Sequence, residues 1–120
     1  MITEVAQTML EKLGYRVVVA NNGEDGIALM KKMGADIDLV ILDMIMPGMD
    51  GGQTFDRIRE IRSTIPVILS SGYSLNGQAE EILYRGCNGF IQKPFGLETL
   101  SAKVHEVMNQ SELSKPSLQS

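Results

Sequence analysis

Three polar residues that could together perform phosphoryl chemistry each follow a short apolar run of strand length. They are Asp43, Ser71 and Lys93. An aspartate carboxylate can accept a phosphoryl group as an acyl phosphate, provided that positive charge and hydrogen-bond donors offset the charge on the transferring oxygens. A lysine ammonium supplies a compact charge for one oxygen, and a hydroxyl donates a hydrogen bond to another. If the fold brings them together, these side chains predict a phosphoacceptor site.

The elements that must position these residues alternate along the chain. Predicted strands cover residues 15–20, 39–42, 66–69 and 89–92, and predicted helices cover 2–13, 23–33, 52–62, 78–85 and 97–108. Asn21 and Asn22 can cap the second helix, and Gly14, Gly34 and Gly86 are expected helix stops. This alternation predicts an α/β fold with right-handed crossovers and a doubly wound, mainly parallel sheet. Ligands of such sheets bind outside the carboxyl ends of the strands, where all three polar residues fall.

Composition bounds the possible functions. The 120 residues are expected to form one domain at 1–109, followed by a disordered tail at 110–120 that is rich in serine. A net charge of −4 argues against direct binding to nucleic acid, and no apolar run is long enough to span a membrane. Cys87 and His105 are the only residues of their types, which excludes an internal disulfide and histidine or cysteine clusters for metals. We expect a cytoplasmic protein.

Three segments closely resemble the motifs of two-component response-regulator receiver domains, the family that includes the chemotaxis regulators. Residues 39–51, LVILDMIMPGMDG, are similar to the phosphorylation strand and its loop. Residues 67–72, VILSSG, resemble the switch strand, and 89–95, GFIQKPF, resemble the last strand with its Lys-Pro pair. The resemblance runs from about residue 1 to residue 109. It implies the flavodoxin-like strand order 2-1-3-4-5.

By this resemblance, Asp43 accepts a phosphoryl group from a histidine kinase or phosphotransfer protein, and Lys93 contacts that group. Ser71, rather than Ser70, is the switch hydroxyl. Phe90 is either the aromatic that follows it inward or a plain core residue. A Mg²⁺ ion would be held by the Asp43 carboxylate and the backbone carbonyl of Ile45. The positions implied to shape the loops are Pro47, Gly51 and Pro94, the last preceded by a cis peptide bond.

The implied function is signalling, not enzymatic turnover. Phosphorylation would switch a protein-interaction face within residues 78–109 toward a downstream protein. The alternative is a receiver-like interaction or oligomerisation module that works without phosphorylation. A hydrolase or phosphotransferase with an aspartyl nucleophile is disfavoured, because such enzymes often carry a second aspartate where Ile45 stands.

The sequence departs from the family at its start. Receiver domains open with an apolar strand that ends in acidic residues, whereas residue 1 here falls inside the first helix. The magnesium site is therefore expected to be incomplete, with weak or absent binding. By the resemblance, the sheet is expected to lack its central strand. Three outcomes are then expected to be open: residues 15–20 and 39–42 pair directly, a strand from another chain fills the gap, or the domain is truncated. We expect a homodimer or larger assembly, with a rearranged or strand-swapped sheet.

Overall fold

The structure is a computed structural model, and it describes residues 4–20, 22–44, 51–72 and 77–113. Its elements in chain order are α1 (Glu4–Lys12), α2 (Gly23–Met33), the short 3₁₀ helix η1 (Gly34–Asp36), β1 (Val40–Asp43), α3 (Gly51–Ile61), β2 (Val67–Ser71), α4 (Gly77–Tyr84), β3 (Gly89–Gln92) and α5 (Leu97–Leu113). The predicted α/β fold is confirmed. None of the helices in these ranges is long and apolar enough to cross a membrane.

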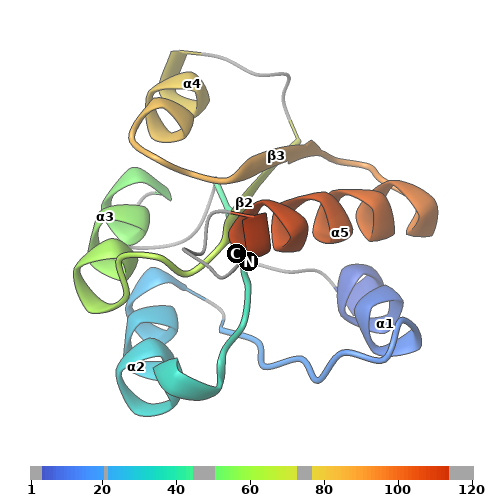
Figure 1. The fold of residues 1–120 in the computed structure, drawn as a ribbon, viewed down its shortest axis with the longest axis horizontal. Coiled ribbons are helices and arrows are strands. Elements are labelled where there is room, and N and C mark those ends of the chain that lie inside the picture. Colours follow the sequence, from blue (N-terminus) through green and yellow to red (C-terminus); the bar gives the residue numbers. More distant parts are fainter. Residues whose placement is uncertain (1–3, 21, 45–50, 73–76, 114–120) are drawn as a thin grey trace.

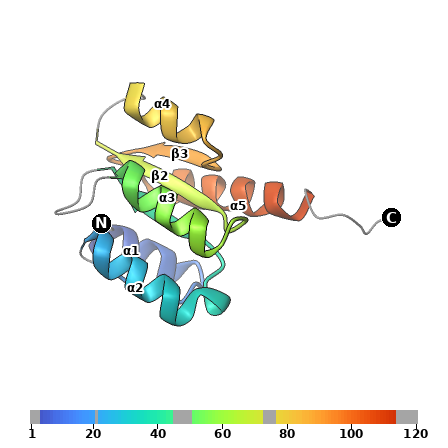
Figure 2. The same cartoon turned by 90° about the vertical axis from the view of Figure 1, so that its left-hand side faces the viewer.

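A parallel sheet of three strands forms the centre of the fold, in the order β1-β2-β3 (Figures 1 and 2). All five residues of the middle strand, β2, are buried. Ile41 pairs with Ile68, and Leu69 pairs with Phe90, so the carboxyl ends of the strands meet at one edge. Strands this apolar are typical of a parallel sheet that is covered on both faces.

The alternation of side chains along β2 separates the core into two layers. Val67 and Leu69 pack with buried residues of α2, α3 and α4, whereas Ile68 packs with those of α1 and α5. Figure 1 shows the same division, with α2, α3 and α4 to the left of the strands and α1 and α5 to the right. Both layers pack against β2, which is therefore covered on its two faces.

Most helix ends follow the predicted signals. The Asn22 side chain accepts a hydrogen bond of 2.7 Å from the Asp25 amide and caps α2, while Asn21 lies outside the described residues. Gly14 and Gly86 follow α1 and α4 with φ of +96° and +113°, a conformation that favours glycine. Gly34 is the C-cap of α2, which ends at Met33 as predicted, but its φ of −52° is right-handed and the chain continues into η1.

The predicted strand at residues 15–20 is wrong as a sheet strand. This segment joins α1 to α2 on the side of the fold away from β3 (Figure 1), and it belongs to none of the three paired strands. Direct pairing with residues 39–42 is also contradicted, because β1 pairs with β2 alone in the described sheet. A β-branched sequence favours extended backbone, but a strand needs a neighbour with which to share its hydrogen bonds.

Two further boundaries differ from the prediction. Ser70 and Ser71 belong to β2 and not to a turn, because their backbones continue the pairing with β1 and β3. Helix α5 ends at Leu113 instead of residue 108, so residues 110–113 are helical and not part of a disordered tail. Residues 114–120 lie outside the described part of the chain.

Candidate functional site

The three predicted chemical residues meet at the carboxyl edge of the sheet. Asp43 is the last residue of β1, Ser71 is the last residue of β2, and Lys93 directly follows β3. The register pairs Asp43 with Ser70 and Ser71 with Gln92, which brings the three strand ends level. The placement at adjacent strand ends agrees with the prediction for this kind of sheet.

Asp43 and Lys93 form an ion pair across the end of the sheet. The Lys93 ammonium donates a hydrogen bond to Oδ2 of Asp43, although 50 residues separate them in the sequence. The Asp43 side chain is 9% exposed and that of Lys93 is 29% exposed. A carboxylate this buried depends on a partner charge, whereas the lysine head remains in contact with water. The pair therefore places a shielded carboxylate oxygen beside a partly exposed ammonium group.

Backbone contacts hold the lysine in place. The Lys93 amide donates a 2.7 Å hydrogen bond to the Ser71 carbonyl, which extends the pairing of β2 and β3 by one step. The Lys93–Pro94 peptide bond is cis, as the resemblance implies. The next apolar residue, Phe95, packs with the core cluster of α1 and α5.

Ser71 and Phe90 lie on the face of the sheet that carries α2, α3 and α4. Ser71 is two residues after Leu69 on β2, so the two side chains share a face. Leu69 belongs to the core cluster of that face, and Phe90 packs against the same cluster while remaining partly exposed. Ser71 is 3% exposed and has interactions of its own. This placement suits both alternatives for Phe90, as a core aromatic and as a neighbour of the switch hydroxyl.

The remaining predicted positions are the second metal ligand and the residues that shape the loops. Ile45 and Pro47 lie outside the described residues. Gly51 begins α3, where an added Cβ would lie 3.2 Å from the Met44 Cα and 3.3 Å from its carbonyl oxygen. The glycine thus allows the start of α3 to pack closely on the residue that follows Asp43. Pro94 is exposed.

Two residues near the site were not foreseen. Met44 is 8% exposed, and its amide donates a 2.9 Å hydrogen bond to the Ser70 carbonyl, which continues the sheet past Asp43. Thr54 on α3 is a polar residue only 2% exposed. No sequence signal marks it, since a threonine in a helix is ordinary. Met44 thus belongs to the packing around the strand ends, and Thr54 is a buried polar residue of α3.

The described residues do not form a complete metal site. Among them, no group of three or more histidine, cysteine, aspartate or glutamate side chains could hold an ion. Asp43 is the carboxylate of the described strand ends, and the second implied ligand, the Ile45 carbonyl, lies outside the described residues. Mg²⁺ prefers an octahedron of oxygens that includes one or two carboxylates and several waters. Among the described residues, the strand ends therefore supply one carboxylate ligand for this ion, that of Asp43.

Comparison with known proteins matches the chain to one family. A family model described as the response regulator receiver domain matches residues 1–105. The chain is 34% identical to the transcriptional regulatory protein ZraR of Klebsiella oxytoca, covering 92% of this chain and 25% of the relative. It is 31% identical to the sensor kinase CckA of Brucella abortus, covering 86% of this chain and 11% of the relative. The chain spans about half or less of the length of the curated relatives it matches.

Solved structures agree with this result. A receiver domain from Clostridium thermocellum superposes with a TM-score of 0.84 at 26% identity, covering 91% of this chain and 86% of that one. The CheX–CheY–BeF3–Mg²⁺ complex from Borrelia burgdorferi contains a similar chain, with a TM-score of 0.78 at 28% identity and coverages of 84% and 76%.

Proposed function

The chain belongs to the response-regulator receiver family, whose members are phosphoacceptors in two-component signalling, and we propose that Asp43 is its acceptor. The observation that carries this proposal is the Asp43–Lys93 ion pair at the carboxyl edge of the sheet. The pair combines a shielded nucleophile with a cation that is still able to move. The alternative of a module that works without phosphorylation is not favoured, because the chain belongs to a phosphoacceptor family and Asp43 pairs with Lys93 as the proposed transfer requires.

In the proposed transfer, a carboxylate oxygen of Asp43 attacks the phosphorus of a phosphohistidine on the donor protein. A P–O bond forms as the P–N bond breaks, and the imidazole nitrogen leaves with the bonding electrons and takes up a proton from water. The product is an acyl phosphate on Asp43. Lys93 moves its ammonium from the carboxylate to a phosphoryl oxygen, so its positive charge stays beside the accumulating negative charge.

Ser71 and Phe90 are proposed to report the phosphorylated state. The Ser71 hydroxyl stands at the end of β2, one strand from Asp43, and would donate a hydrogen bond to a phosphoryl oxygen. If it moves toward Asp43, the face that it shares with Phe90 opens, and the partly exposed ring can turn inward. The proposed readout is therefore the surface around β3 and its neighbouring helices.

Receiver domains use Mg²⁺, and we propose that Asp43 is one ligand of this ion here, with the Ile45 carbonyl as a second. When bound, the ion would neutralise charge on the phosphoryl oxygens. The described residues offer too few carboxylates to fit a strong site, so we expect weak binding. A titration with beryllofluoride and Mg²⁺, followed by fluorine NMR, measures this affinity directly.

Receiver domains interact with histidine kinases and phosphotransfer proteins, and we propose a partner of that class as the donor. The downstream target is proposed to bind the face within residues 78–109. Tyr84 and Leu97 in this range are 94% and 40% exposed, and such side chains supply contact area for a protein partner.

Self-association is also proposed, with a second copy of the chain as the partner of the β1 edge. Residues 40–42 are apolar, and β1 has a partner on one side only among the described strands. Edge strands normally carry charges, prolines or bulges that block pairing, and this run has none of them. Light scattering across a concentration series would contradict the proposal if the mass stayed that of a monomer at about 100 μM, a generous concentration for detecting a micromolar dimer.

The acceptor proposal is tested by intact mass spectrometry after treatment with acetyl phosphate and Mg²⁺. Phosphorylation adds about 80 Da, the mass of one phosphoryl group. We expect the adduct in the parent and in Asp36→Asn, an exposed aspartate that serves as the matched control. We expect no adduct in Asp43→Asn and a reduced yield in Lys93→Met. An adduct that persists in Asp43→Asn would reject Asp43 as the acceptor.

A further inference from the structure

Two arginines cross in opposite directions between α3 and the carboxyl end of α4. Arg59 belongs to α3 and donates to the Gly86 carbonyl at 3.0 Å and to Oδ1 of Asn88 at 2.9 Å. Arg85 directly follows α4 and reaches back to α3, where its Nη1 donates to both carboxylate oxygens of Asp56 at 2.7 and 2.6 Å. Together they form a reciprocal clasp, made by Arg59, Arg85, Asp56 and residues 86–88.

The Arg59 half of the clasp is partly buried and fully engaged. Its guanidinium also donates to the Ile65 carbonyl at 2.5 Å and lies over the ring of Phe55, 4.9 Å from its centre. Phe55 is itself only 1% exposed. Burial lowers the pKa of Arg59 from its ordinary value, with a smaller opposing effect from Cys87. A guanidinium held this way, by a ring and three acceptors, has little freedom to move.

Asn88 connects the clasp to the sheet. The side-chain Oδ1 of Asn88 accepts a 2.9 Å hydrogen bond from the Val67 backbone amide as well as the bond from Arg59. The backbone amide of Asn88 donates to the Val67 carbonyl at 2.9 Å. Val67 is the first residue of β2, at the end of the strand opposite to Ser71. The end of α4 is therefore fixed to α3 and to the base of the central strand.

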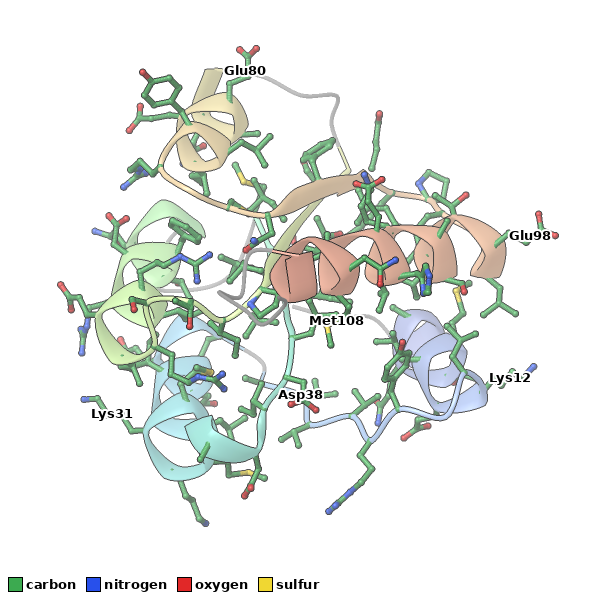
Figure 3. The ribbon with its side chains drawn as sticks, in the orientation of Figure 1. Lys12, Lys31, Asp38, Glu80, Glu98 and Met108 are labelled. Atoms are coloured by element: carbon green, nitrogen blue, oxygen red, sulfur yellow. The ribbon has the colours of Figure 1, made fainter. Side chains whose placement is uncertain are left out.

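The amino end of α4 is placed differently. Gly77 and Gln78 are exposed, and an added Cβ on Gly77 would meet nothing within 4 Å. Figure 3 shows the labelled Glu80 pointing away from the rest of the fold. Of the two buried residues of α4, the larger, Ile82, lies in the half nearer to the clasp, and only the small Ala79 lies in the other half. This end follows Ser71, the residue proposed to sense the phosphoryl group.

From this asymmetry we propose that the arginine clasp is a pivot for switching: phosphorylation swings the amino end of α4 while the carboxyl end stays anchored on α3. The inference rests on the proposed function of Asp43 for its trigger. Its structural half, the anchoring of residues 84–88 by Arg59 and Arg85, does not depend on phosphorylation. The two halves are therefore tested separately.

The anchor is tested in the unphosphorylated protein by amide hydrogen exchange of Arg59→Met and Arg85→Met. The amides of Arg85, Cys87 and Asn88 are hydrogen-bonded to the carbonyls of Glu81, Ile82 and Val67, so they should be protected in the parent. Each variant should speed their exchange several-fold and leave the β1 amides unchanged. Arg57→Met is the matched control, because Arg57 pairs with Glu60 within α3 and crosses to no other element through that pair. Equal exchange in parent and variants would overturn the anchor.

The pivot is tested by distances between pairs of spin labels, in a Cys87→Ala background. One pair joins Glu60→Cys on α3 to Gln78→Cys, and the other joins Glu60→Cys to Tyr84→Cys; all three positions are exposed. On phosphorylation, the distance between the labels at 60 and 78 should change, while the distance between those at 60 and 84 stays the same. Adding Arg59→Met should let the 60–84 distance change as well.

The possible outcomes separate the two proposals. A mass adduct with no shift at Gln78, or with equal shifts at both positions, would overturn the pivot and leave Asp43 as the acceptor. Absence of any adduct in the parent would instead refute the proposed function, and the exchange measurement would still decide whether the clasp anchors α4.

Discussion

Replacing Lys93 by methionine should leave the Asp43 carboxylate buried without its cation. The Asp43 side chain is 9% exposed, so it has little access to water that could substitute for the ammonium. Removing one partner of a fully buried ion pair costs about 3–5 kcal/mol, but Lys93 is 29% exposed and the pair is partly screened. We therefore expect a loss of about 2 kcal/mol in the free energy of unfolding, a value between buried and surface pairs.

The assay is urea unfolding followed by circular dichroism, with a built-in control. Lys103 is 27% exposed and pairs with the 54% exposed Glu106 at 3.2 Å, so Lys103→Met removes a lysine of matched exposure from a solvated carboxylate. That variant should change stability by less than about 0.5 kcal/mol, as is usual for a surface pair.

A second substitution separates the buried charge from lost packing. Adding Asp43→Asn to Lys93→Met removes the carboxylate that has lost its lysine and should recover a large part of the lost stability, so the two changes should be strongly non-additive. The reasoning is refuted if Lys93→Met lowers the free energy of unfolding no more than Lys103→Met does. It is also refuted if adding Asp43→Asn recovers none of the lost stability, because Lys93 would then not be what balances the Asp43 charge.

Three further predictions concern packing, titration and capping. Gly89→Ala should cost about 1–2 kcal/mol because its Cβ would lie 3.0 Å from a methyl group of α5, whereas Gly96→Ala, which meets nothing within 4 Å, should be neutral or stabilising in the same urea assay. Burial raises the pKa of the Cys87 thiol, so the thiol ionises at a lower pH in the unfolded chain than in the folded one. The parent should therefore lose stability relative to Cys87→Ala as the pH rises above the ordinary thiol pKa of about 8.5. A stability difference that does not change with pH would contradict this. Asn22→Ala should cost about 1 kcal/mol by removing the cap of α2, and a loss below about 0.3 kcal/mol in thermal unfolding would show that water replaces it.

The sequence by itself predicts the elements whose signals are local. The bounds of α2 agree at both ends, because an asparagine cap precedes Gly23 and apolar residues recur at helical spacing up to Met33. The apolar runs at 39–42 and 66–69, which became β1 and most of β2, indicate strands covered on both faces, which implies a parallel sheet. The meeting of Asp43, Ser71 and Lys93 then follows from topology, since parallel strands end at the same edge.

The tertiary structure decided what depends on a partner distant in sequence. Residues 15–20 have strand-like composition, yet they join no sheet, because none of the strands in the described part of the chain accepts their hydrogen bonds. The Asp43–Lys93 pair spans 50 residues, and the contacts from Arg59 to Gly86 and Asn88 span 27 and 29. A local pattern determines backbone preference within a few residues, whereas pairing and ion-pair geometry exist only once the chain has folded. The placement of the proposed site's residues at adjacent strand ends was therefore predictable from the sequence, and the contacts that hold the end of α4 were not.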